Sequence, residues 1–139
     1  MSIERRRLRV YVAGPISSNV FEGVWRGLSA GRAMFLDGLA PFIPHTDALF
    51  FLGDGGAGDN WNAYLEYDLE YILVADAVYR LAGASKGADL EVERALALNI
   101  PVFVQESAHV TGDQDPGYRA LLRHAAAVGL NGKREASVL

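Results

Sequence analysis

Short apolar runs alternate with longer amphipathic segments along the chain of 139 residues. The runs are rich in β-branched and aromatic residues and are bounded by turn-forming or polar residues, which is typical of strands. The predicted strands are residues 8–13, 40–45, 76–81 and 100–105. The longer segments repeat apolar residues every three or four positions, which predicts helices. The predicted helices are residues 19–38, 61–74, 87–98 and 118–128.

The alternation of strands and helices predicts the fold class. A helix between two strands forms a right-handed crossover, which makes the strands parallel and places helices on both faces of the sheet. We therefore expect an α/β fold, a three-layer Rossmann- or flavodoxin-like doubly wound parallel sheet of four to five strands. The length suits one domain over residues 1–139, with a basic arm at 1–7 and a frayed tail at 130–139.

The loops after the strands are where sheets of this kind bind ligands. Candidates for chemistry therefore lie in these loops and in the helix turns that they open. The loops are residues 14–18, 45–60, 82–86 and the stretch after Gln105. The second loop contains the glycine-rich run GDGGAGDN, which we interpret as a flap or a surface excursion.

Composition excludes several classes of function. The net charge of −4 argues against general nucleic-acid binding, and the basic run Arg5–Arg7 fits a solvated arm better than a nucleic-acid contact. The absence of cysteine excludes disulfides, thiolate catalysis and cysteine-based zinc sites, and it fits the cytoplasmic location that we expect. No apolar run is long enough to span a membrane, and the charged N-terminal segment lacks the apolar stretch of a signal peptide.

The first predicted helix carries several large apolar residues. Val20, Val24 and Leu28 recur in it at helical spacing, with Phe21, Trp25 and Phe35 alongside.

The third predicted helix carries a glutamate beside its apolar stripe. Ala88, Val92, Ala95 and Leu96 form the stripe, and Glu91 falls at its edge. A buried carboxylate is costly and its pKa rises unless a partner holds it. Glu91 is therefore either paired or kept near the apolar edge for a purpose, or it is an ordinary glutamate at the edge of the surface.

The second predicted helix shows a similar feature. Asp68 sits in the middle of an apolar stripe that includes Leu65 and Ile72. Such an aspartate can be structural, or it can join Glu91 in acid–base or nucleophilic chemistry. A second stripe of tyrosines (Tyr64, Tyr67 and Tyr71) indicates either an interface between subunits or packing under the glycine-rich loop.

Two strand-to-helix turns could bind an anion. AGPISS at 13–18 offers backbone N–H groups at a helix start, although it is neither a P-loop nor a GxGxxG motif. Ser85 opens a further helix, and helix capping explains it as well as anion binding does. His45 follows the second strand, but His109 and His124 show no ligand spacing with it, so we expect no metal site.

Taken together, several segments resemble the nucleoside 2-deoxyribosyltransferase-like superfamily, which includes deoxynucleoside 5′-monophosphate N-glycosidases and small uncharacterised relatives. YVAGPI at 11–16 resembles its opening Tyr-x-x-Gly-x-Ile signature. DLEYILVADAVYRL at 68–81 resembles its element of an aspartate, a helix, Ala-Asp and a strand. SKGADLEVERALALNIPVF at 85–103 resembles its Ser-x-Gly-x-x-x-Glu helix and Pro-Val strand, and Pro44-His45 recurs in the small relatives.

The resemblance implies catalytic roles for three residues. Glu91 matches the nucleophile that attacks the anomeric carbon and forms a covalent glycosyl-enzyme. Asp68 matches an aspartate that holds the sugar or assists protonation. Tyr11 matches a tyrosine whose hydroxyl positions the nucleophile.

The resemblance also implies a set of substrate-binding residues. Ser85 matches a serine that binds the 5′-phosphate in the monophosphate-specific branch. Asp76 matches the aspartate of the Ala-Asp position, although a structural role in the turn before the third strand explains Asp76 better. The residues expected at the substrate are Gly14, Pro15, Ile16, Ser17, His45, Asp76, Ser85 and Gly87.

The chain departs from the family pattern at the first turn and near the C-terminus. Pro15 removes one N–H donor, and the arginine that some members carry after the first strand is missing. The residue that a neighbouring subunit often supplies near the C-terminus has no clear match in this chain, and Ser107 is only a guess for it.

The implied activity is cleavage of the N-glycosidic bond of a (deoxy)nucleoside or its 5′-monophosphate, by hydrolysis in preference to base exchange. The resemblance implies no cofactor and a homodimer or larger homo-oligomer, with the tyrosine-rich helix near the interface. The partner would be a small molecule, not a nucleic-acid polymer or a membrane. One alternative is a module that binds a nucleotide without turnover. Another is a flavodoxin-like protein, for whose isoalloxazine site the sequence offers no residues.

Overall fold

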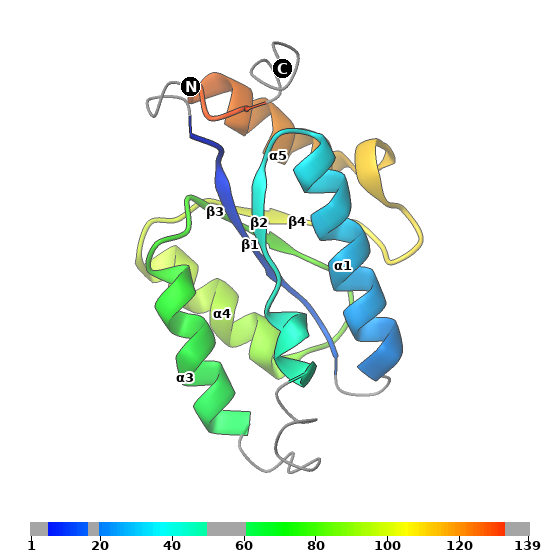
Figure 1. Ribbon diagram of the computed structural model, residues 1–139, viewed down its shortest axis with the longest axis vertical. Helices are drawn as coiled ribbons and strands as arrows, with labels where there is room; N and C mark the ends of the chain where they lie inside the picture. Colours follow the sequence, from blue (N-terminus) through cyan, green and yellow to red (C-terminus); the bar gives the residue numbers. More distant parts are fainter. Residues whose placement is uncertain (1–5, 17–19, 50–60, 133–139) are drawn as a thin grey trace.

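A computed structural model describes residues 6–16, 20–49 and 61–132 of the chain. Its centre is a parallel sheet with the strand order β2-β1-β3-β4 (Figure 1). The strands are β1 (Arg9–Ala13), β2 (Ala40–Phe42), β3 (Ala77–Arg80) and β4 (Val102–Val104). The helices are α1 (Val20–Leu36), α3 (Trp61–Ile72), α4 (Lys86–Ala97) and α5 (Pro116–Ala127), with the 3₁₀ helices η1 (Pro44–Leu49) and η2 (Gly112–Gln114). This arrangement confirms the predicted α/β class.

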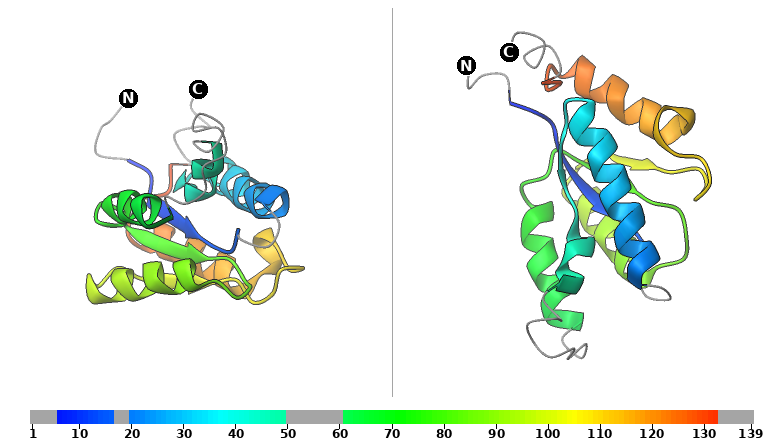
Figure 2. Two further views of the ribbon diagram at one scale, coloured as in Figure 1. Left: turned by 90° about the horizontal axis from the view of Figure 1, so that it is seen from below. Right: turned by 45° about the vertical axis from the view of Figure 1, so that its right-hand side comes forward.

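The side chains of the central strands alternate between two cores, which accounts for the three layers. Val10 and Val12 of β1 pack with residues of α1 and α5, whereas Tyr11 and Ala13 pack with residues of α3 and α4. Successive side chains of a strand point to opposite faces, so the central strands are covered on both. Figures 1 and 2 show α1 and α3 on opposite sides of β1 and β2.

The second strand is shorter than the sequence predicts. β2 ends at Phe42, and His45, predicted at the end of this strand, lies in η1. Pro44 explains the difference, because its ring fixes φ near the helical value and it has no N–H to donate to a sheet. His45 and Asp47 are therefore carried on a helical turn that packs beside α1.

The last helix begins earlier than predicted because Asp115 caps it. The buried Asp115 carboxylate accepts the N–H of Tyr118 at 2.9 Å, and Pro116 occupies the first helical turn. The same carboxylate accepts the Tyr79 hydroxyl at 2.6 Å and the N–H of Glu106 at 2.9 Å. A single side chain thus joins α5 to β3. None of the described helices is long and apolar enough to cross a membrane.

Helix α1 packs on the rest of the fold through glycines. Gly23, Gly27 and Gly31 are buried and repeat every four residues, so they lie along one line of the helix. A methyl group at Gly27 would lie 2.7 Å from Cγ of His45, and one at Gly31 would lie 2.1 Å from Cδ1 of Ile43. The missing side chains let the backbone of α1 approach η1 and the segment after β2 closely.

The residues whose spacing predicts α1 face solvent. Phe21, Trp25 and Phe35 are 89%, 70% and 60% exposed, and Val20 and Leu28 are also exposed. The helix prediction holds, but the buried face is the glycine face. The aromatic face of α1 is left open in the described part of the molecule.

Gly27→Ala tests this close packing. Helix propensity alone favours alanine over glycine by about 1 kcal/mol. Contact with the His45 ring opposes this gain, and overpacking of a filled interior costs about 1–3 kcal/mol. We expect a lower free energy of unfolding in urea for Gly27→Ala. The control is Ser29→Ala on the exposed side of the same helix. A Gly27→Ala protein that is stabilised as much as the control would contradict the packing.

Candidate active site

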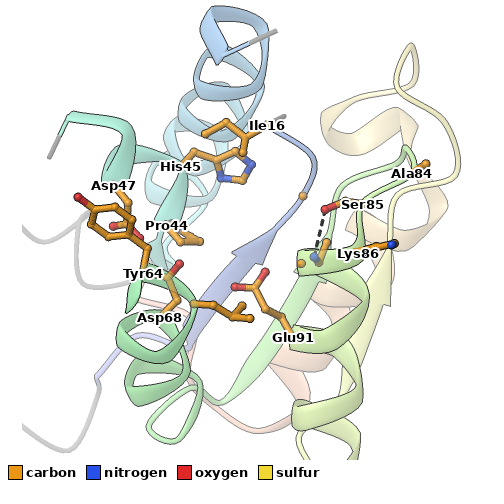
Figure 3. Close-up of a pocket in the computed structure, with 14 residues that line it drawn as sticks. Ile16, Pro44, His45, Asp47, Tyr64, Asp68, Ala84, Ser85, Lys86 and Glu91 are labelled. Atoms are coloured by element: carbon orange, nitrogen blue, oxygen red, sulfur yellow. Dashed lines mark hydrogen bonds between the residues drawn. The ribbon is translucent and has the colours of Figure 1, made fainter. Parts of the chain in front are cut away.

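A cavity of about 490 Å³ opens at the carboxyl ends of the strands, between α3, α4, η1 and the loop after β1 (Figure 3). It lies where the topology predicts a ligand. The lining residues are Gly14, Ile16, Pro44, His45, Asp47, Tyr64, Leu65, Asp68, Ala84, Ser85, Lys86, Gly87, Ala88 and Glu91.

Glu91 projects from α4 into this cavity while being only 6% exposed. The hydroxyl of the buried Tyr11 on β1 donates a hydrogen bond to Oε2 of Glu91. Burial raises the pKa of Glu91 to about 7, against the opposing effect of the Tyr11 hydroxyl. The choice left open by the periodicity is resolved, because Glu91 is buried and paired and does not stand at the surface.

Asp68 of α3 faces the same cavity and has a carboxyl group for a neighbour. Asp68 is 8% exposed and Asp47 of η1 is 9% exposed. Burial and the hydrogen bond with the Asp47 carboxyl raise the pKa of Asp68 to about 9, and the charges of Asp47 and Glu91 add to the shift. At neutral pH, Asp68 therefore holds a proton that it can donate.

His45 presents a neutral imidazole at the cavity. Its ring is 3% exposed and is held against α1 by the close approach at Gly27. Burial, together with the nearby charge of Arg26, lowers the pKa of His45 to about 4. Both ring nitrogens are buried, and neither has a hydrogen-bond partner within the described residues.

The N-terminus of α4 forms the opposite wall. Ser85 caps the helix, because its Oγ accepts the N–H of Ala88 at 3.1 Å. Ser85, Lys86 and Gly87 line the cavity together with Gly14 and Ile16 from the loop after β1. Backbone N–H groups and the helix dipole favour an anion at such a position. Capping and ligand binding are compatible here, since the hydroxyl hydrogen of Ser85 is not used by the cap.

Asp76 does not join the site. It precedes β3, at the opposite end of the strand from the cavity, where its carboxylate accepts the N–H of Arg9 at 2.8 Å and pairs with Arg6 at 2.6 Å. Its role is to fix the start of the strand, so the expectation of a substrate contact is corrected. Pro15 is not among the lining residues, and Ser17 lies outside the described residues, as does the glycine-rich run.

The tyrosine stripe of α3 is divided among different surroundings. Tyr64 lines the cavity, whereas Tyr71 stacks on Phe42 with ring centroids 4.2 Å apart, and Tyr67 packs edge-on against Tyr71. Ser107 does not line the cavity of this chain, and its Oγ accepts the N–H of His109 at 3.3 Å.

Sequence reasoning missed Asp47, Tyr64 and Lys86 as lining residues. The signal for Asp47 was its position two residues after His45 in a loop that follows a strand. In the described part of the chain, no group of three or more His, Asp or Glu side chains is arranged to hold a metal ion.

The fold is similar to that of a solved bacterial protein. A 2-deoxyribosyltransferase from the psychrotolerant bacterium Bacillus psychrosaccharolyticus matches with a TM-score of 0.57 and 18% sequence identity, over 84% of this chain and 81% of the other. Identity this low shows a shared fold and leaves the activity to be argued from the site. A comparison with curated proteins gave no match.

A protein-family model gives a more direct assignment. The model described as a domain of unknown function, DUF4406, matches residues 8–104, which is more than half of the chain and includes β1 through β4. The chain therefore belongs to the DUF4406 family, one of the families of the nucleoside 2-deoxyribosyltransferase-like superfamily.

Proposed function

We propose that this protein cleaves the N-glycosidic bond of a (deoxy)nucleoside or its 5′-monophosphate through a covalent bond to Glu91. The observation that carries the proposal is the Glu91 carboxyl itself. It is buried at the wall of a cavity, hydrogen-bonded to Tyr11, and has a second carboxyl group, Asp68, across the same cavity. Two carboxyl groups with different pKa values are the arrangement that glycosidic cleavage requires.

In the first step, an oxygen of ionised Glu91 attacks the anomeric carbon C1′. The C1′–O bond forms as the C1′–N bond breaks, and the electron pair of the broken bond goes to the nitrogen of the base. Asp68 donates its proton to the base as it leaves. The Tyr11 hydroxyl holds the Glu91 carboxyl in position.

In the second step, water attacks C1′ of the glycosyl-enzyme. The bond to Glu91 breaks, its electron pair returns to the carboxylate, and Asp68 recovers a proton from the water. A second base in place of water would give exchange, and we prefer water as the acceptor. The N-terminus of α4 with Ser85 is the proposed place for a 5′-phosphate, and His45 lines the same cavity.

We also propose that the protein forms a homodimer or larger homo-oligomer. The support comes from α1, more than from the tyrosine-rich α3. The exposed Phe21, Leu28 and Phe35 repeat every seven residues, and Trp25 lies four residues after Phe21. This spacing is typical of a helix that packs against another helix along one seam, and a second copy of α1 supplies the same seam.

Release of free base tests the activity. The protein is mixed with a panel of deoxynucleosides, ribonucleosides and their 5′-monophosphates, and the free base is measured by chromatography. We expect Glu91→Ala and the isosteric Glu91→Gln to lose at least about 1000-fold in rate, because the nucleophile is removed. The control is Glu93→Gln on the exposed side of α4. Unchanged release by Glu91→Ala would exclude Glu91 as the nucleophile, and tight binding of a nucleotide recovered intact would favour a binding module.

The pH dependence follows from the two carboxyl groups. Glu91 must be ionised and Asp68 protonated, so kcat/KM should rise as the pH passes about 7 and fall as it passes about 9. The Tyr11 hydroxyl lowers the pKa of Glu91, so Tyr11→Phe should move the acidic limb to higher pH. Tyr71→Phe, whose hydroxyl contacts Tyr67, is the control. An acidic limb that stays in place in Tyr11→Phe would show that Tyr11 does not act on the nucleophile.

Light scattering after size exclusion tests the association. We expect a mass that is a multiple of 15.0 kDa, and a lower mass for the double variant Phe21→Ser, Trp25→Ser, because the apolar seam is interrupted. Leu73→Ser, at an exposed apolar position outside α1, is the control. A monomeric wild-type protein would refute the assembly, and an unchanged mass for the double variant would exclude α1 as its interface.

A further inference from the structure

One buried acidic group at the cavity has no part in the two steps above. Asp47 lies on η1, is 9% exposed, and lines the cavity together with Asp68 and Glu91. Figure 3 shows these carboxyl groups coming from three different elements, η1, α3 and α4, around one space. Asp47 is neither at the surface nor in an ion pair within the described part of the chain. A buried carboxyl group of this kind requires a compensating interaction.

The compensating interaction is with Asp68. The side chains of Asp47 and Asp68 are within hydrogen-bonding reach of each other. Two carboxylates cannot form a hydrogen bond without a proton, and two adjacent buried negative charges are strongly unfavourable. Oδ2 of Asp47 and Oδ1 of Asp68 are buried from solvent, and neither accepts a hydrogen bond from any other described group. The pair therefore binds one proton between its two carboxyl groups.

Few groups around the Asp47–Asp68 pair could neutralise its second negative charge if the shared proton were lost. The titratable groups that face the pair are Glu91 and Lys86 of α4, Tyr11 of β1, His45 of η1, and Tyr64 and Tyr67 of α3. Glu91 repels a negative charge on the pair, His45 is neutral, and the Tyr11 hydroxyl is already donated to Glu91. Lys86 is exposed and lies on the far wall with Ser85.

We propose that Asp47 and Asp68 share a single proton, and that Asp47 is a positioning residue which keeps this proton on the pair until the base departs. The inference rests on the proposed function, and it adds a residue to the site. In the first step the shared proton moves to the nitrogen of the leaving base as that nitrogen receives the electron pair of the C1′–N bond. The pair is left with two negative charges.

The same two charges assist the second step. A pair of adjacent carboxylates is a stronger base than a single one, so it removes a proton from the incoming water as the water oxygen bonds to C1′. The bond from C1′ to Glu91 breaks, and Glu91 recovers its charge. The pair ends with one proton, as it began, and atoms and charges balance over the cycle.

Carbon-13 NMR of the aspartate carboxyl groups tests the sharing without any need for activity. The full chain is titrated in the presence of a metal chelator, and the signal of Asp68 is assigned by its loss in Asp68→Asn. In the wild-type protein we expect Asp68 to titrate near pH 9, far above an ordinary aspartate. In Asp47→Asn it should titrate at least one pH unit lower, because the neighbouring charge is gone. The exposed Asp113→Asn serves as the control and should cause no change.

Three results would overturn the proposal. If neither Asp47 nor Asp68 titrates above about pH 6 in the wild-type protein, a shared proton is excluded, because the pair must hold its last proton to high pH. An Asp68 signal that is unaffected in a folded Asp47→Asn protein excludes Asp47 as the cause. An unchanged alkaline limb of kcat/KM in Asp47→Asn, where we expect a shift to lower pH by at least one unit, excludes a role in catalysis. If the wild-type protein releases no base, the proposed function fails, and the titration still decides whether the proton is shared.

Discussion

The hydrogen bond from Tyr11 to Glu91 is the interaction on which the candidate site depends. A carboxyl group on the buried face of a helix is unfavourable unless a donor compensates it, and the donor here comes from the central strand of the sheet. The bond therefore ties α4 to β1 at the carboxyl end of the sheet. It also holds the Glu91 side chain at the cavity, where desolvation brings its pKa close to neutrality. A carboxyl group with a pKa near 7 can be ionised at neutral pH, and because it is buried it is only weakly solvated when it reacts.

A second constraint comes from the glycine face of α1. Without side chains at Gly27 and Gly31, the helix lies close to η1 and fixes His45, which is two residues from Asp47. The position of the Asp47 carboxyl thus follows from the close packing of α1. As a consequence, the large apolar residues on the other side of α1, which would normally form the buried face of a helix, are exposed.

The site combines groups of opposite electrostatic character in two parts of one cavity. Asp47, Asp68 and Glu91 make the part between η1, α3 and the middle of α4 acidic, whereas the start of α4 with Ser85 and Lys86 favours an anion. A nucleoside 5′-monophosphate has matching ends, a phosphate and a base that accepts a proton as it leaves. In the reaction that we propose, the start of α4 holds the phosphate and the carboxyl groups act at the anomeric carbon and the base.

The sequence by itself determined the α/β class, the order of the strands and helices, and the unusual placement of Glu91 and Asp68, because these follow from local periodicity and from turn residues. It did not determine the buried face of α1 or the separation of Asp76 from the cavity, which Gly27 and Arg6 decide through contacts with residues distant in the chain. The end of β2 was predicted too late although its cause is local, since Pro44 fixes φ and has no N–H to donate. The partner of Asp68 was equally hidden, since Asp47 becomes its neighbour only when η1 and α3 come to line the same cavity. Periodicity reports which face of an element is apolar, whereas the pairing of two buried acids is decided by the tertiary structure.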